Sequence, residues 1–235
     1  MLTFYLRKEE VIDRPTVTVS YAQTLDGRLA TSSGNSRWIS APESLRFAHQ
    51  LRAEHDAVAV GAGTACNDDP RLTVRLVPGD DPLRVVVDST LRTPLSAAVL
   101  VNGAAQGTVL AVTDQAPDER CEEAESLGAT VLRLPADAAG RVDLGTLLSG
   151  LGSLGVRSVM VEGGAALITS FLCERLVDRL VVCIAPKILG RGIEAVGDLG
   201  IYDLTDSLTL ADTSVTPYGV DLVLDSRVGY PDDRR

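Results

Sequence analysis

The chain is poor in the residues that build metal sites and disulfide frameworks. It contains only four cysteines and two histidines among 235 residues, and no two cysteines have the C-x-x-C spacing of many metal sites. Because zinc is held mainly by closely spaced Cys and His side chains, we predict no metal site. Scattered cysteines are typical of a reducing compartment, so we expect a cytoplasmic location.

Basic residues are outnumbered by acidic ones, and long apolar runs are lacking. The chain has 22 Lys and Arg against 32 Asp and Glu, which gives a formal charge of −10. A surface of this sign repels phosphate backbones, so we expect no nucleic-acid partner, and any anionic ligand requires a local cluster of arginines. Charged residues interrupt each apolar stretch well before the roughly 20 residues of a membrane span, so we expect no membrane partner.

Short β-branched runs alternate regularly with amphipathic helical patterns along the chain. The runs predict strands at Thr16–Tyr21, Ala57–Val60, Leu83–Asp88, Thr108–Val112, Thr130–Arg133, Ser158–Val161, Arg179–Ile184, Thr209–Pro217 and Val220–Asp225. Helices are predicted at about 40–54, 117–127, 144–151 and 165–175. This alternation predicts an α/β fold with a predominantly parallel central sheet, flanking helices and a C-terminal antiparallel hairpin.

Local signals set the expected boundaries. The segment Ser40-Ala41-Pro42-Glu43 has the pattern of a capping box with proline in the first turn, and it predicts the start of the first helix. No repeat or low-complexity linker divides the chain. We therefore predict a single domain over residues 14–226, an N-terminal extension over 1–13 and a frayed tail over 227–235.

Two glycine-containing turns follow predicted strands. Gly61-Ala62-Gly63-Thr64 resembles part of a dinucleotide fingerprint, but the third glycine is missing and no long crossover helix follows. In the segment 161–166, an apolar strand ends in Glu162, and two glycines then precede a helix. Amides at such a helix start suit a pyrophosphate, and the carboxylate would face the ligand crevice. The alternative is a tight turn with a solvated acid.

Three charged or aromatic candidates lie elsewhere. The segment Asp68–Arg75 holds two acids and two arginines, which suit a sugar phosphate, although a charged surface loop is the simpler interpretation. Trp38 could stack on a ligand ring or cover the core, and Arg52 could bind an anion or face the helix dipole. With no Ser or Cys motif beside either histidine, nucleophilic catalysis has little support.

Taken in order, the motifs resemble a known family. They are YAQTLDGRLA (21–30), SRWIS (36–40), LRA (51–53), VGAGT (60–64), DDPRLT (68–73), VDS (87–89), VEGG (161–164) and APKILG (185–190). This order is similar to that of the ribosylaminopyrimidine reductases of riboflavin biosynthesis, over about residues 14–224. The resemblance implies a dihydrofolate-reductase-like α/β fold, a homodimer and an NADPH-dependent oxidoreductase. Such an enzyme transfers hydride to C1′ of the opened sugar of a ribosylamino-pyrimidine 5′-phosphate and yields the ribitylamino product.

The resemblance also implies site residues, position by position. The substrate contacts would be Ser36, Arg52, Leu72, Arg75 and Glu162. The cofactor contacts would be Ala22, Trp38, Thr64, Asp68, Ser89, Gly163, Gly164, Ala165, Ala166 and Leu167, with the segment continuing to Ser170. Asp68 is the first candidate for proton handling and Glu162 the second. Ser89, Thr90 and Arg92 follow a strand and could bind the 2′-phosphate of NADPH.

Two departures from the family pattern bear on the substrate. Nothing here resembles the zinc deaminase domain of the bifunctional members, so we expect the reductase alone. Those members have lysine where this chain has Ser20, which favours the 2,5-diamino-pyrimidinone substrate of the free-standing fungal and archaeal enzymes.

Other functions remain open at this point. One is reduction of another heterocycle, such as 5-amino-6-ribosylaminouracil phosphate, a pterin or folate-like compound, or a specialised metabolite. The presence of Arg52 and Arg75 argues against substrates that lack a phosphate. Another is a non-catalytic nucleotide-binding module, against which Asp68 and Glu162 argue.

Overall fold

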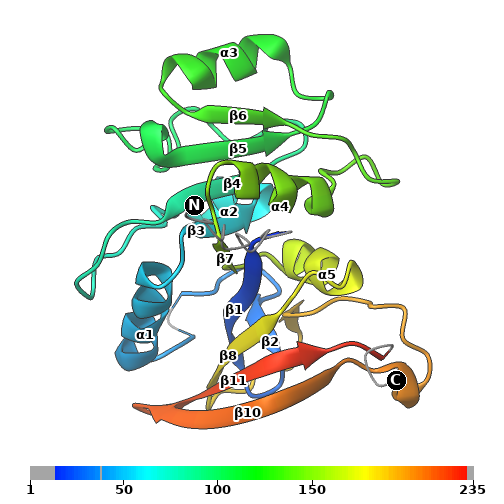
Figure 1. The fold of residues 1–235 in the computed structure, drawn as a ribbon. Helices are drawn as coiled ribbons and strands as arrows, with labels where there is room; N and C mark the ends of the chain where they lie inside the picture. Colours follow the sequence, from blue (N-terminus) through cyan, green and yellow to red (C-terminus); the bar gives the residue numbers. More distant parts are fainter. Residues whose placement is uncertain (1–13, 38, 232–235) are drawn as a thin grey trace, which may run out of the picture.

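A computed structural model describes residues 14–37 and 39–231 and contains one large sheet (Figure 1). Its strands are β1 (Thr16–Thr24), β3 (Ala57–Gly61), β4 (Leu83–Val87), β5 (Thr108–Val112), β6 (Thr130–Arg133), β7 (Ser158–Val161), β8 (Arg179–Ala185), β10 (Thr209–Tyr218) and β11 (Asp221–Gly229). Their order is β10-β11-β8-β1-β7-β3-β4-β5-β6. The strands from β8 to β6 are mutually parallel, and only β11 and β10 run antiparallel to their neighbours. The predicted parallel sheet with a C-terminal antiparallel hairpin is confirmed.

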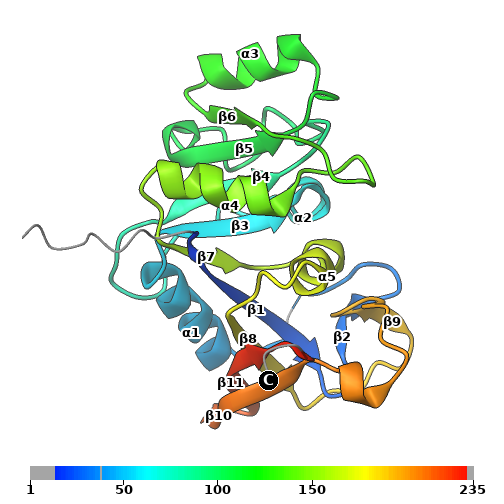
Figure 2. The same ribbon diagram turned by 45° about the vertical axis from the view of Figure 1, so that its right-hand side comes forward.

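Helices cover both faces of this sheet. They are α1 (Pro42–Ala53), α2 (Ala62–Asp68), α3 (Asp118–Ser126), α4 (Leu144–Ser153) and α5 (Ala165–Cys173), with 3₁₀ turns at Ala105–Gly107 and Leu204–Asp206. Because side chains alternate along a strand, Ala57 and Ala59 pack with α4 and α5, whereas Val58 and Val60 pack with α1, α2 and α3. Figures 1 and 2 show α1 and α5 on opposite sides of β1. The two cores are thus separated by the sheet itself.

The start of α1 differs from the prediction. The N-cap residue is Ala41, not Ser40, and no side chain of the helix's own first turn caps it. Asp221, at the start of β11, instead accepts bonds from Ala41 N at 2.6 Å and from Ser44 Oγ at 2.7 Å. The capping-box prediction is therefore wrong in mechanism, because a buried carboxylate from a distant strand satisfies the first turn.

Three elements have no counterpart in the prediction. Helix α2 begins directly after β3, and the short strands β2 (Arg28–Thr31) and β9 (Gly192–Glu194) form a second, two-stranded sheet. Strand β11 also continues to Gly229, into the segment where fraying is predicted, and Tyr230 Oη bonds to both main-chain groups of Val177. The predicted extension over 1–13 lies outside the described residues. No described helix has the length and apolar character needed to cross a bilayer.

Candidate active site

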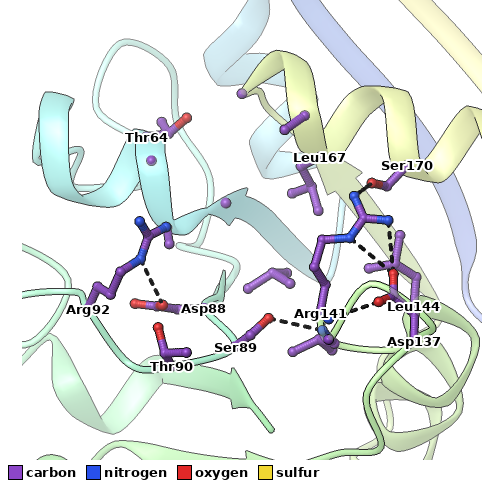
Figure 3. Close-up of a pocket in the computed structure, with 18 of the residues that line it drawn as sticks. Thr64, Asp88, Ser89, Thr90, Arg92, Asp137, Arg141, Leu144, Leu167 and Ser170 are labelled. Atoms are coloured by element: carbon purple, nitrogen blue, oxygen red, sulfur yellow. Dashed lines mark hydrogen bonds and ion pairs between the residues drawn. The ribbon is translucent and has the colours of Figure 1, made fainter. Parts of the chain in front are cut away.

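A hollow at the carboxyl ends of β3 and β4 has a volume of about 440 Å³. Its wall comes from these strand ends, from α2 and α5, and from the loop 137–142 (Figure 3). We call it the large pocket. Strand β3 lies between β4 and β7, where the chain reverses its direction across the sheet. Open α/β sheets bind ligands at such switch points, and the volume suits a cofactor-sized molecule.

The glycine turn before α5 leaves the main chain open toward this pocket. Gly163 and Gly164 have φ of +129° and +82°, a region that L side chains rarely adopt. A Cβ on Gly164 would also come within 3.1 Å of Thr64 Oγ1. Since α5 begins at Ala165, its first free amides lie beside this opening, where the helix dipole favours an anion.

Asp88 supplies a buried acceptor at one end of the large pocket. Its side chain is only 1% exposed, and Oδ2 accepts bonds from Thr93 N and Oγ1, both at 2.7 Å. Oδ1 has no hydrogen-bond partner among the described residues, and the nearest cation is Arg92 Nε at 3.9 Å (Figure 3). A buried orphan acceptor is costly unless it is satisfied, so a hydroxyl or amino group of a ligand fits here.

Arg141 lies across the pocket from Arg92 and reaches the α5 wall. It donates to Ser170 Oγ at 3.0 Å and to Asp137 Oδ2 from Nε at 3.0 Å and Nη2 at 2.9 Å (Figure 3). The backbone N–H and guanidinium of Arg141 hold the pKa of Asp137 below its ordinary value. Sequence reasoning missed both residues, because a single arginine in an irregular loop carries no motif.

A smaller pocket of about 190 Å³ lies among β1, α1, β7 and β8. We call it the small pocket. Ser20, Tyr21 and Ala22 of β1 line it together with Arg52 and Glu162. Burial raises the pKa of Tyr21 to about 12, so its hydroxyl keeps its proton at neutral pH. Glu162 faces the small pocket and Gly164 the large one, so the segment 162–164 separates the two pockets.

Arg52 and Glu162 form a two-pronged ion pair between α1 and the end of β7. Nε lies 2.5 Å from Oε1 and Nη2 lies 2.6 Å from Oε2, and each side chain is 12% exposed. Nη1 also donates to Thr73 O at 2.9 Å. The guanidinium carries more N–H groups than these three bonds use, so it can still donate to an anion.

A second arginine, Arg75, lies in the loop between α2 and β4 and donates to the same Thr73 carbonyl as Arg52. Burial, followed by the charges of Arg52 and Arg71, lowers the pKa of Arg75 from its ordinary value. Arg52 and Arg71 thus act on Arg75 as a cluster of like charges, while Asp81 and Glu162 act on it in the opposite direction. In a chain of formal charge −10, such a cluster is the local positive site that an anionic ligand requires.

The structure brings most of the predicted cofactor residues to the two pockets. Thr64, Ser89, Gly164, Ala166, Leu167 and Ser170 line the large pocket, and Ala22 lines the small one. Gly163 and Ala165 flank Gly164 in the turn that separates them. Thr90 and Arg92 also line the large pocket.

Three further predicted residues do not line either pocket, and a fourth lies outside the described residues. Asp68 is the exposed last residue of α2, and Ser36 is exposed in the loop after β2. Leu72 has φ of +53° and a side chain that is 2% exposed and packed in the core, so a ligand could meet only its main chain. Trp38 lies outside the described residues.

Comparison with known proteins gives a consistent family. The model of the family described as the RibD C-terminal domain matches residues 15–224. The chain is 43% identical over 213 residues to riboflavin biosynthesis protein RibD of Aquifex aeolicus, covering 90% of this chain and 57% of that protein. It is also 43% identical over 220 residues to the 2,5-diamino-6-ribosylamino-4(3H)-pyrimidinone 5′-phosphate reductase of Methanothermobacter thermautotrophicus, covering 88% of this chain and 99% of that protein.

The fold agrees with these similarities. The structure of Acinetobacter baumannii RibD superimposes with a TM-score of 0.80 at 28% identity, over 92% of this chain and 58% of that one. This chain thus spans little more than half the length of the RibD proteins, but nearly the full length of the archaeal reductase. The fold expected from the sequence motifs is confirmed.

Proposed function

The chain belongs to the RibD C-terminal domain family, and from this membership we propose that it is a riboflavin-biosynthesis reductase acting on a ribosylamino-pyrimidine 5′-phosphate. The observation that carries the proposal is the arrangement around residues 162–164. A dinucleotide-sized pocket lies on one side of this segment, and a small pocket lined by Arg52 and Glu162 lies on the other. Two ligands held there would meet across the segment, as a redox reaction between them requires.

A nicotinamide cofactor follows from membership of this reductase family, and the large pocket fits a dinucleotide. The open main chain at Gly164 and the start of α5 would hold the pyrophosphate, and the orphan Oδ1 of Asp88 would accept a bond from the nucleoside. When bound, such a cofactor supplies the hydride. NADPH is the proposed form, since Ser89, Thr90 and Arg92 could bind its 2′-phosphate.

The proposed substrate-binding residues act through charge and position. Arg52 and Arg75 bind the 5′-phosphate, and Glu162 fixes the plane of the Arg52 guanidinium while its carboxylate faces the small pocket. Ser36 and the main chain at Leu72 are the further candidates for substrate contact. Asp68 and Glu162 are the candidates for proton handling as the sugar opens.

The proposal also specifies whether the substrate is the pyrimidine before or after deamination. Ser20, which replaces the lysine of the bifunctional members, lines the small pocket. A neutral hydroxyl in that place fits the uncharged amino-substituted ring of the 2,5-diamino-pyrimidinone, which is the substrate named for the archaeal relative. The proposed substrate is therefore the compound before deamination.

An assay of the purified chain tests the function directly. NADPH oxidation would be followed by absorbance with the diamino-pyrimidinone, with its deaminated counterpart, and with each compound after removal of the 5′-phosphate. We expect the diamino compound to react fastest, the dephosphorylated compounds to react poorly, and NADH to replace NADPH weakly. Faster turnover of the deaminated compound would contradict the substrate, and no oxidation with any compound would contradict the function.

A homodimer is also part of the proposal. Strand β10 forms the outer edge of the large sheet, and none of its ten residues is buried. The side chains of Leu210 and Val215 are 43% and 57% exposed. An uncovered edge strand with apolar side chains is a natural pairing surface.

A further inference from the structure

The loop between α2 and β4, which carries Arg75, is held by side chains of α1 and by one of its own side chains. Three consecutive residues of the loop each have one main-chain group bonded to a different side chain. The bonds are Arg52 Nη1 to Thr73 O at 2.9 Å, Val74 N to Asp81 Oδ1 at 2.7 Å and Arg75 N to His49 Nδ1 at 3.0 Å. Two of the three side chains come from α1, at positions one turn apart, so one face of this helix sets the path of the loop.

His49 is the least exposed member of this set, at 1%. Because Nδ1 accepts the N–H of Arg75, it must carry a lone pair, and the proton of the neutral ring is on Nε2. Burial and the charges of Arg52 and Arg75 lower the pKa of His49 to about 4. The imidazole is therefore neutral at every pH near 7, and the bond to Arg75 is retained.

A neutral acceptor has an advantage over a charged one at this position. An aspartate in place of His49 could accept the same N–H, but its negative charge would lie beside the arginine cluster and weaken the attraction of Arg52 and Arg75 for a phosphate. An apolar side chain would remove the side-chain acceptor of the part-buried Arg75 amide. Only a neutral acceptor fixes the loop and preserves the positive field.

We propose that His49 is a positioning residue of the sugar-phosphate site, which fixes the main chain at Arg75 without adding charge. The inference rests on the proposed function insofar as Arg75 binds the 5′-phosphate. His49 itself touches no substrate; it acts through the Arg75 main chain.

Three substitutions separate the requirement for a hydrogen-bond acceptor from the requirement for a neutral side chain. His49→Asn retains a neutral acceptor at the position of Nδ1, His49→Asp retains an acceptor but adds charge, and His49→Leu removes the acceptor. The dissociation constant of ribose 5-phosphate would be measured by calorimetry without cofactor, and the KM values for substrate and for NADPH would be measured by turnover. We expect His49→Leu and His49→Asp to weaken ribose 5-phosphate binding and raise the substrate KM by about tenfold. We expect His49→Asn to remain within about threefold of the wild type.

The matched control is the other histidine of the same region. His55 bonds to Leu51 O and to Thr18 Oγ1, away from the loop. His55→Asn should leave the binding of ribose 5-phosphate and both KM values unchanged. The KM for NADPH should also be unchanged in all His49 variants. If thermal unfolding shows that His49→Leu is folded, and this variant binds ribose 5-phosphate as tightly as the wild type does, the role of His49 is refuted.

The remaining outcomes are also decisive. A loss of binding in His49→Asn equal to that in His49→Leu would refute the acceptor role. The first variant keeps a neutral acceptor and the second does not, so equal losses would mean that the acceptor has no effect on binding. Equal binding by His49→Asp and His49→Asn would refute the requirement for neutrality. The wild type could also bind ribose 5-phosphate while none of the tested pyrimidines supports NADPH oxidation. The proposed function would then fail, but calorimetry would still decide the role of His49.

Discussion

At the scale of single residues, the ion pair between Arg52 and Glu162 dominates the site. Both side chains are 12% exposed, so each has lost most of its hydration and depends on the other. Arg52 and Glu162 are predicted separately from the sequence, one as a phosphate ligand and one as an acid. Their direct contact is a finding of the structure, because the two residues are 110 positions apart in the sequence.

Removal of either Arg52 or Glu162 should therefore lower the stability of the fold. We expect Glu162→Ala to lower the free energy of unfolding by about 3–5 kcal/mol, because the Arg52 charge would remain buried without its partner. The matched control is Glu194→Ala, which breaks the pair with Arg28 where the Glu194 side chain is 64% exposed. Urea unfolding should show a loss of only about 0–1 kcal/mol for the control. Equal losses for the two variants would contradict a buried, mutually dependent pair.

The lowered pKa of His49 predicts a pH effect of defined sign. The pKa is about 4 in the folded chain against an ordinary 6.5, so between these values the unfolded chain binds the extra proton. Stability is then fully present above about pH 6.5 and falls as the pH drops toward 4, by about 1.4 kcal/mol per pH unit for this group. The measurement is the free energy of unfolding of the wild type minus that of His49→Asn. A difference that stays constant between pH 6.5 and 4 would contradict a lowered pKa of His49 in the folded chain.

At the scale of elements, α1 carries residues of the small pocket and contacts the loop that holds Arg75. Its first turn is held by Asp221 of β11, its middle carries His49, and its last turn carries Arg52. Asp221 is 1% exposed and also accepts a bond from Cys183 Sγ at 3.5 Å. Burial raises the pKa of the Cys183 thiol to about 11, so it remains a donor at neutral pH. A single carboxylate thus ties the hairpin β10–β11 and strand β8 to the helix.

Loss of this carboxylate should loosen the start of the helix. We expect Asp221→Ala to lower the free energy of unfolding by at least about 2 kcal/mol, because it leaves buried donors unsatisfied. Arg227→Ala on the same strand breaks only an exposed pair with Asp212, where the side chains are 65% and 77% exposed. That control should cost about 0–1 kcal/mol in the same urea experiment. A loss below about 1 kcal/mol for Asp221→Ala would show that Ala41 and Ser44 find other partners.

Elements whose stability is mainly local were predictable, whereas those that depend on distant partners were not. Inner strands such as β3 and β5 appear as apolar runs because both of their faces are buried. Strands β2 and β9 escape prediction because they are short and pair across more than 160 residues. Helix α2 escapes because its seven residues include Gly63 and follow β3 without a polar capping residue.

At the scale of the whole molecule, the large sheet ends in the exposed strand β10. The exposed side chain of Val215 lies opposite Leu224 of β11. If the proposed dimer forms through this edge, Val215→Arg should place charges against each other across the interface and weaken association. Sedimentation velocity should show a dimer for the wild type and a dissociation constant raised by about tenfold or more for the variant. A wild-type monomer would contradict the dimer, and an unaffected variant would place its interface elsewhere.

Residue patterns alone predict the α/β class, the order of most strands and helices, and the motifs that identify the family. These properties depend on periodicity and on short segments, which are local. The tertiary structure alone decided that Glu162 meets Arg52, that Asp221 begins a helix 180 residues earlier in the chain, and that Arg141 and Asp88 share a pocket with Gly164. Such contacts join residues that no local pattern relates, because the side chains approach one another only when parallel strands bring their carboxyl ends to one edge of the sheet.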